Sequence, residues 1–181
     1  GLGDVYKRQV EGINVDEVMG SDERMTMIAN HIIANHKSKT RNRQYTALFT
    51  VWSIPALVKY YDIFKSIDHD LNIAGCYSYA ANEDGEGKAE HSRDSLERII
   101  SDYNKLYDTN FSTDTYEAYR KDISDRVKGK KTKPLDILIV VNQFLTGFDA
   151  KPLDVLYVDK KLEYHDLLPV SYTHLTLPTI R

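Results

Sequence analysis

The fold is decided by the stretch Ile137-Leu138-Ile139-Val140-Val141-Asn142-Gln143-Phe144-Leu145-Thr146-Gly147-Phe148-Asp149-Ala150-Lys151-Pro152. Its first five residues are all apolar, which is typical of a β-strand covered on both faces. Such strands occur in parallel sheets, whose ligand sites lie beyond the carboxyl ends of the strands. Gly147 permits close approach of the backbone to a ligand, and Asp149 supplies a carboxylate. A plain turn at the end of a strand is the alternative interpretation.

Outward from this stretch, the sequence alternates between strand and helix patterns. β-Branched and aromatic residues predict strands over 46–52, 72–79 and 155–158. Apolar residues at helical spacing predict helices over 21–36, 54–64, 94–107 and 116–127. Ser53 and Pro55 mark the start of the second helix, because serine is a favoured N-cap and proline fits the first turn. The alternation predicts an α/β fold with a doubly wound parallel sheet.

Two details of the helical region follow from local signals. Asp94 and Glu97 have the spacing of a capping box, so a helix is expected to begin at Asp94. The preceding segment 81–88 is polar and contains two glycines, which predicts an exposed loop. The tyrosines between Tyr103 and Tyr119 could stack on bases, but their helical spacing favours packing in the core.

Composition excludes several classes of protein. The 181 residues carry 24 Lys and Arg against 27 Asp and Glu, a net charge of −3, which excludes a globally basic nucleic-acid coat protein. A local basic groove remains open. Cys76 is the single cysteine, and no secretory leader is evident, so a reducing cytoplasm is favoured. No apolar run approaches the roughly 20 residues that span a bilayer, so no membrane is expected.

Motifs for catalysis are weak. Gly87-Lys88 is followed by Ala89 rather than Ser or Thr, so it is no phosphate-binding P-loop. The histidines have no paired spacing that suits zinc, and we predict no metal site. Asp136 with Asp159-Lys160-Lys161 has the outline of a magnesium-dependent nuclease, in which two carboxylates hold the ion. The alternative for Asp136 is a surface cap ahead of its strand.

The segment Leu145-Thr146-Gly147-Phe148-Asp149-Ala150 resembles helicase motif V as it occurs in the motor subunit of type I restriction enzymes. The resemblance continues in order over about residues 10–168. The segments that carry it are Phe49–Ser53 with Tyr60–Phe64, Tyr77–Glu83, Arg93–Leu96, Asp102–Asn104 and Leu156–Leu162 with Tyr164-His165. It implies the second RecA-like lobe of a helicase-like ATPase, which grips duplex DNA and closes on ATP bound to the first lobe.

The resemblance also implies roles for individual residues. Thr146, Gly147, Phe148 and Asp149 would lie at the ATP cleft and couple the nucleotide state to the grip on DNA. Thr50 and Ser53 would face DNA phosphates, which suits hydroxyls and N–H groups at the start of a helix.

From the residues alone, Lys130 and Lys131 are candidates for phosphate attraction, with a solvated loop as the alternative. The implied cofactors are ATP and Mg²⁺, bound mainly by the first lobe. The implied partners are double-stranded DNA and the methylation and specificity subunits, in a prokaryotic cytoplasm.

Both ends of the chain depart from the family pattern. Residues 1–9 and 169–181 resemble translated sequencing-adapter sequence, and we expect both to be non-native tails around a lobe over 10–168. Pro169 stands where the pattern would continue toward a motif VI helix with an arginine finger. We therefore expect the lobe to be incomplete and inactive alone. A non-catalytic nucleic-acid-binding α/β module is the competing interpretation.

Overall fold

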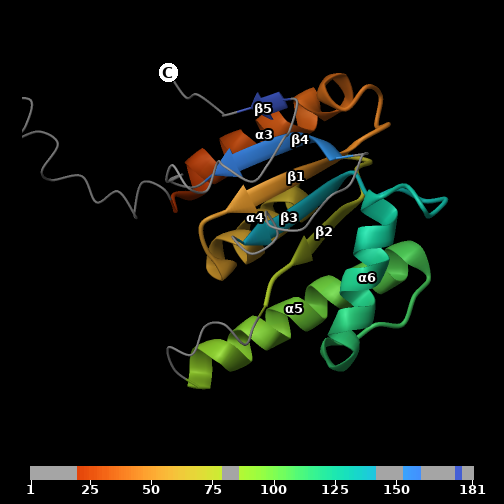
Figure 1. The fold of residues 1–181 in the computed structure, drawn as a ribbon. Helices are drawn as coiled ribbons and strands as arrows, with labels where there is room; N and C mark the ends of the chain where they lie inside the picture. The colour runs from red at the N-terminus through yellow and green to blue at the C-terminus, as the bar shows by residue number, and fades with distance from the viewer. Residues whose placement is uncertain (1–19, 79–85, 142–152, 160–173, 177–181) are drawn as a thin grey trace, which may run out of the picture.

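A parallel β-sheet forms the centre of the molecule in the computed structural model, which describes residues 20–78, 86–141, 153–159 and 174–176 (Figure 1). The strands are β1 (Thr46–Val51), β2 (Ile73–Cys76), β3 (Ile137–Val141), β4 (Leu153–Asp159) and β5 (His174–Thr176). Their order across the sheet is β2-β3-β1-β4-β5, and every neighbouring pair is parallel. The predicted α/β fold is confirmed.

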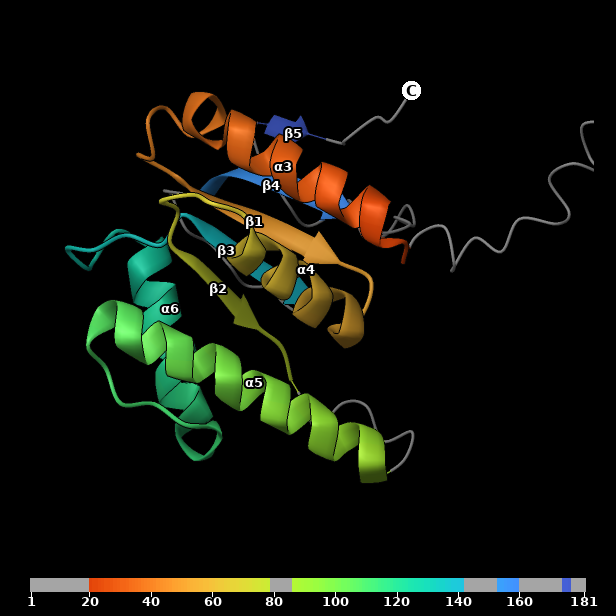
Figure 2. The ribbon, with the colours of Figure 1, turned by 180° about the vertical axis from the view of Figure 1, so that it is seen from behind.

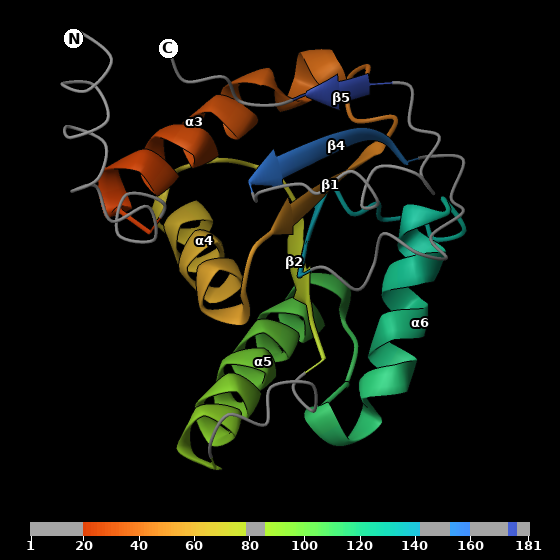
Figure 3. The ribbon, with the colours of Figure 1, turned by 60° about the vertical axis from the view of Figure 1, so that its left-hand side comes forward.

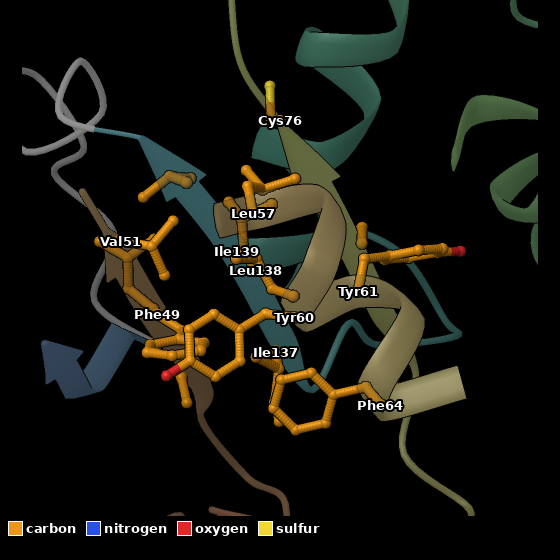
Figure 4. Close-up of a cluster of buried hydrophobic side chains, with 14 of the residues drawn as sticks. Phe49, Val51, Leu57, Tyr60, Tyr61, Phe64, Cys76, Ile137, Leu138 and Ile139 are labelled. Carbon is orange, nitrogen blue, oxygen red and sulfur yellow. The ribbon is translucent and has the colours of Figure 1, made fainter. Parts of the chain in front are cut away.

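Helices flank the sheet on both faces. They are α3 (Asp22–Lys39), α4 (Ile54–Ser66), α5 (Glu86–Tyr107) and α6 (Tyr116–Val127), with the short 3₁₀ turn η2 (Thr113–Thr115) ahead of α6. Figures 2 and 3 show α3, α4 and α5 on one side of the sheet and α6 on the other side, next to β2. On the first face the Phe49 ring lies 4.8 Å from the Tyr60 ring and 6.3 Å from the Phe64 ring (Figure 4).

The strands are as buried as the apolar run predicts. All six residues of β1 are buried, and so are the first four of β3. The register pairs Ala47 with Ile137 and Val51 with Val141. β1 therefore lies between β3 and β4, where both of its edges are hydrogen-bonded and both of its faces are covered.

The helix starts were predicted with mixed success. Ser53 caps α4, and its side chain accepts a hydrogen bond from the Ala56 N–H at 3.2 Å, as expected. The predicted start of α5 is wrong, because that helix already begins at Glu86 and Asp94 is an exposed residue in its interior. Residues 86–93 include Glu, Lys and Ala, which favour helix, so the helix extends past the capping signal. It thereby includes the end of the expected loop 81–88.

The tyrosine-rich stretch packs in the core, as predicted. Tyr103 and Tyr119 are fully or almost fully buried, and their ring centroids are 5.0 Å apart. The Tyr119 hydroxyl donates to the Gly75 carbonyl at 2.8 Å, and that of Tyr103 donates to Asp122 at 2.6 Å. Each buried hydroxyl thus has a hydrogen-bond partner, which lets tyrosine fill the core without an unpaired polar group.

Two features bear on the ends of the chain and on membranes. The edge strand β5 falls within residues 169–181, which were predicted to be a non-native tail outside the lobe. That this stretch is a non-native tail stays a prediction. Within the described ranges, the structure contains no helix with the length and apolar character needed to span a bilayer.

Candidate functional site

The carboxyl edge of the sheet is where the sequence predicts function, and three strand ends meet there. Val51 of β1 pairs with Val141 of β3 on one side and with Asp159 of β4 on the other. The arrowheads of these strands point the same way in Figure 1. Ser53 follows after Trp52 and caps α4, so the positive end of the helix dipole and the N–H groups of Ser53 and Ile54 lie at this edge, while Pro55 has no N–H and the Ala56 N–H donates to the Ser53 side chain. That combination suits the binding of an anion such as phosphate.

Thr50 lies at the same edge, but its side chain is enclosed. Its exposed fraction is 0%, and its hydroxyl has no hydrogen-bond partner among the residues that the structure describes. Its neighbours across the sheet are Val140 and Val158. Contact with a DNA phosphate therefore stays a prediction for Thr50, and it requires this hydroxyl to become uncovered.

The residues predicted to lie at the ATP cleft fall in 142–152, outside the described part of the chain. Thr146, Gly147, Phe148 and Asp149 follow the last residue of β3 in the sequence, and their roles stay predictions.

The two predicted lysines belong to the opposite edge. Lys130 and Lys131 are exposed in the connection that enters β3, at the amino end of the strand. Their ammonium groups lie 3.2 Å from the carboxylates of Asp125 and Asp122, respectively. A strand of six residues is about 20 Å long, so the sheet separates these lysines from Ser53. The structure thus does not bring the four predicted DNA-backbone residues together.

Asp136 is buried, and the surface cap suggested for it is wrong. Its exposed fraction is 1%. Arg43 donates to it through Nε at 2.7 Å and Nη2 at 2.6 Å, and the Asn72 N–H donates at 2.7 Å. The His36 imidazole lies 3.8 Å away. Burial acts to raise the pKa of Asp136, but these interactions outweigh it and hold the pKa below its ordinary value.

The geometry also argues against a nuclease that uses Asp136 and Asp159 together. The Asp136 carbonyl accepts a hydrogen bond from Ala47 at one end of β1, while Asp159 pairs with Val51 at the other end. Four residues of strand put the two backbones about 13 Å apart. A magnesium ion binds its oxygen ligands at about 2 Å, so these carboxylates cannot share one ion. No group of three potential metal ligands occurs in the described ranges.

Asp159 is a second buried carboxylate, and the sequence indicated neither its burial nor its partners. Arg24 donates to both of its oxygens, one of them at 3.0 Å, and the Tyr60 hydroxyl donates to it as well. The hydrogen bond to Asp159 raises the pKa of Arg24, although burial acts to lower it. Burial and Asp159 raise the pKa of Tyr60, so its hydroxyl stays protonated. The three residues are far apart in the sequence, and no local signal links them.

Residues 43–172 match the family model described as type I restriction enzyme subunit R domain 3. The chain belongs to this family. Among type I restriction enzyme endonuclease subunits, it is 53% identical to one from Staphylococcus aureus (strain COL) over 166 residues. It is 59% identical to one from Staphylococcus saprophyticus over 167 residues. Each match covers 88% of this chain and 18% of the relative, so this type I subunit R domain spans less than a fifth of those subunits.

Proposed function

We propose that this chain is the second RecA-like motor lobe of an ATP-dependent, DNA-translocating restriction subunit. In this proposal the lobe grips duplex DNA at the carboxyl edge of its sheet and closes on ATP held by the first lobe. The observation that carries it is the Ser53-capped start of α4 at that edge, beside the ends of β1, β3 and β4. Family membership supports the same assignment.

The chemistry of this edge fits binding that ignores base sequence. Helix N–H groups and a serine hydroxyl recognise phosphate oxygens, which are the same at every base pair. A translocase needs that indifference, because it must release and rebind the backbone at each step. ATP-bound and ATP-free states would favour different separations of the two lobes, so the cycle would move this grip along the duplex.

The described residues do not fit a magnesium site. Asp159, which lies at the carboxyl edge in the described part of the chain, is already bound by Arg24 and Tyr60. We propose that ATP and Mg²⁺ are bound mainly by the first lobe, and we derive no step through them. We also propose that the 181-residue chain alone neither hydrolyses ATP nor cleaves DNA. DNA-stimulated phosphate release above that of a heat-inactivated sample would contradict this.

Two substitutions of Ser53 test the grip on DNA. Aspartate and asparagine both cap helices, so either variant should keep α4 intact. Only Ser53→Asp places a negative charge where a phosphate is proposed to bind. In the full-length subunit, Ser53→Asp should weaken binding of non-specific duplex DNA roughly threefold to tenfold and Ser53→Asn should change it less than twofold. Equal affinities for the two variants would refute the contact.

A third substitution separates the motor from its competitor, a non-catalytic nucleic-acid-binding module. In the complete enzyme with its methylation and specificity subunits, Asp149→Ala should abolish the coupling of ATP hydrolysis to translocation without reducing thermal stability. In a binding module Asp149→Ala would be neutral, and Lys130→Ala with Lys131→Ala would instead remove most of the DNA affinity. The location of both lysines at the amino edge, beside carboxylates, favours the motor.

A further inference from the structure

Tyr60 and Asp159, which are buried, and Arg24, whose side chain is 20% exposed, form a cluster at the carboxyl edge of the sheet. Asp159 is the last residue of β4, with an exposed fraction of 3%. It receives hydrogen bonds from the Arg24 guanidinium on both oxygens and from the Tyr60 hydroxyl on one. Arg24 belongs to the first turn of α3 and Tyr60 to the middle of α4. The carboxylate thus joins two helices to the point where the chain leaves the sheet.

The same cluster reaches the proposed DNA grip through ring contacts. The Tyr60 ring lies 4.8 Å from Phe49 of β1 and 6.4 Å from Trp52, both edge to face (Figure 4 shows Tyr60 against Phe49). Trp52 directly precedes the cap residue Ser53. A shift of Asp159 would therefore move the Tyr60 hydroxyl, and the ring would transmit that shift to the turn between β1 and α4.

Packing alone does not require an ion pair at this position. Buried ion pairs contribute little net stability compared with apolar residues of similar volume, and their best-attested use is to fix one arrangement. The neighbouring residue Tyr61 serves as a comparison, because its hydroxyl also donates to a carboxylate but joins two helices to each other. It is also buried, and its hydroxyl donates to Asp102 of α5 at 3.2 Å, on the helical face and away from the strand ends.

We propose that Arg24, Tyr60 and Asp159 are positioning residues that couple the exit of β4 to the turn between β1 and α4. The inference rests on the proposed motor function and deepens it. Asp159 leads into the residues that follow β4, and Ser53 binds the DNA backbone. Hydrogen bonds through one carboxylate make the two segments move as a unit, so that a change in lobe closure reaches the grip on DNA.

The test uses the full-length subunit in its complete enzyme and compares Tyr60→Phe with the matched control Tyr61→Phe. Each variant loses one buried hydroxyl and keeps its ring. The readout is the number of base pairs translocated per ATP hydrolysed, together with the DNA-stimulated ATPase rate. Tyr60→Phe should lower the number of base pairs translocated per ATP roughly threefold and should leave the ATPase rate within twofold of the wild-type rate. Tyr61→Phe should change neither.

Substitutions of Arg24 test the same coupling independently, and one of them, Arg24→Lys, keeps the positive charge. Arg24→Gln should lower the coupling ratio at least as much as Tyr60→Phe, and Arg24→Lys should restore part of it, because lysine keeps the charge and one hydrogen bond. If Arg24→Gln fails to fold, the tyrosine pair decides alone. Unchanged coupling in Tyr60→Phe, or an equal loss in Tyr61→Phe, overturns the inference. Absence of ATP-driven translocation in the wild-type enzyme would instead overturn the proposed function.

Discussion

Replacing Asp136 by asparagine keeps the size of the side chain and removes its charge. The carboxylate is 1% exposed and accepts three hydrogen bonds, two from Arg43 and one from the Asn72 N–H. These bonds tie together the connections that enter β1, β2 and β3. An asparagine has one acceptor oxygen, and its NH₂ group would face the donors of Arg43. The variant therefore loses at least one hydrogen bond and removes one of the two carboxylates that pair with the Arg43 guanidinium.

The expected loss follows from the burial of the two partners. Breaking a buried ion pair by removing one partner costs about 3–5 kcal/mol. The Arg43 side chain is 23% exposed and also contacts Asp70, so water and that carboxylate offset part of the loss. We therefore expect Asp136→Asn to lower the free energy of unfolding by about 2–4 kcal/mol at pH 7.

The difference in free energy of unfolding between wild type and Asp136→Asn should become smaller as the pH falls. The pKa of Asp136 is below its ordinary value in the folded chain, so the ionised carboxylate stabilises the fold. This contribution is fully present above the unfolded pKa of about 4 and disappears as the pH falls through the folded pKa. The gap between wild type and Asp136→Asn should thus be constant above about pH 5 and should narrow below about pH 4.

Urea unfolding of the chain from pH 3 to 8, followed by circular dichroism and by the fluorescence of the single tryptophan, Trp52, measures this gap. The control is Asp114→Asn, because Asp114 is 81% exposed and pairs with Arg93 at 2.8 Å. A surface pair contributes about 0.5 kcal/mol or less. If Asp136→Asn were no more destabilising than this control, or if the gap did not narrow in acid, the reasoning would fail.

Three further predictions concern the core around β2. In Gly75→Ala the new Cβ would lie 3.1 Å from Leu57 Cδ2, so we expect the free energy of unfolding to fall by about 1–2 kcal/mol in urea titrations. Tyr119→Phe removes the hydroxyl that donates to the Gly75 carbonyl, and it should lower the free energy of unfolding by about 1–2 kcal/mol. An unchanged free energy of unfolding would mean that water replaces the hydroxyl. Burial raises the pKa of the Cys76 thiol to about 12, so a thiol reagent at pH 8 should label the native chain far more slowly than the urea-unfolded chain.

The strands β1 to β4 and most helices could be predicted because their signals are local, whereas β5 was not predicted. The apolar run at 137–141 must be covered on both faces wherever it lies in the fold. Ser53 caps α4 by accepting a hydrogen bond from the Ala56 N–H, only three residues further along the chain. The start of α5 shows the limit of such signals. Asp94 has the right chemistry for a cap, yet the residues before it also favour helix, and Glu97 instead accepts a hydrogen bond from the distant Thr113 N–H at 2.7 Å.

The buried charges could not be predicted, because their partners are distant in the chain. Nothing near Asp136 indicates that Arg43 will neutralise it, and nothing near Asp159 indicates Arg24 or Tyr60. An acidic residue at the boundary of a strand is ordinarily exposed, so the sequence alone favours a surface position. The position of the lysines near 130, in contrast, could be predicted. They precede the strand at 137–141 and Ser53 follows the strand at 46–52, so a parallel sheet places them at opposite edges.

The central place of β1 has a consequence for how the chain is made. In the described part of the chain, β1 precedes α4, β2, α5 and α6, and its neighbours β3 and β4 come only after all of them. A nascent chain that ends before Ile137 lacks both strands that pair with β1, and the unpaired edges of a largely apolar strand are the kind of segment that recruits other chains. We therefore expect the sheet to close only when residues far along the sequence have been synthesised, and we expect its folding to be slow for that reason.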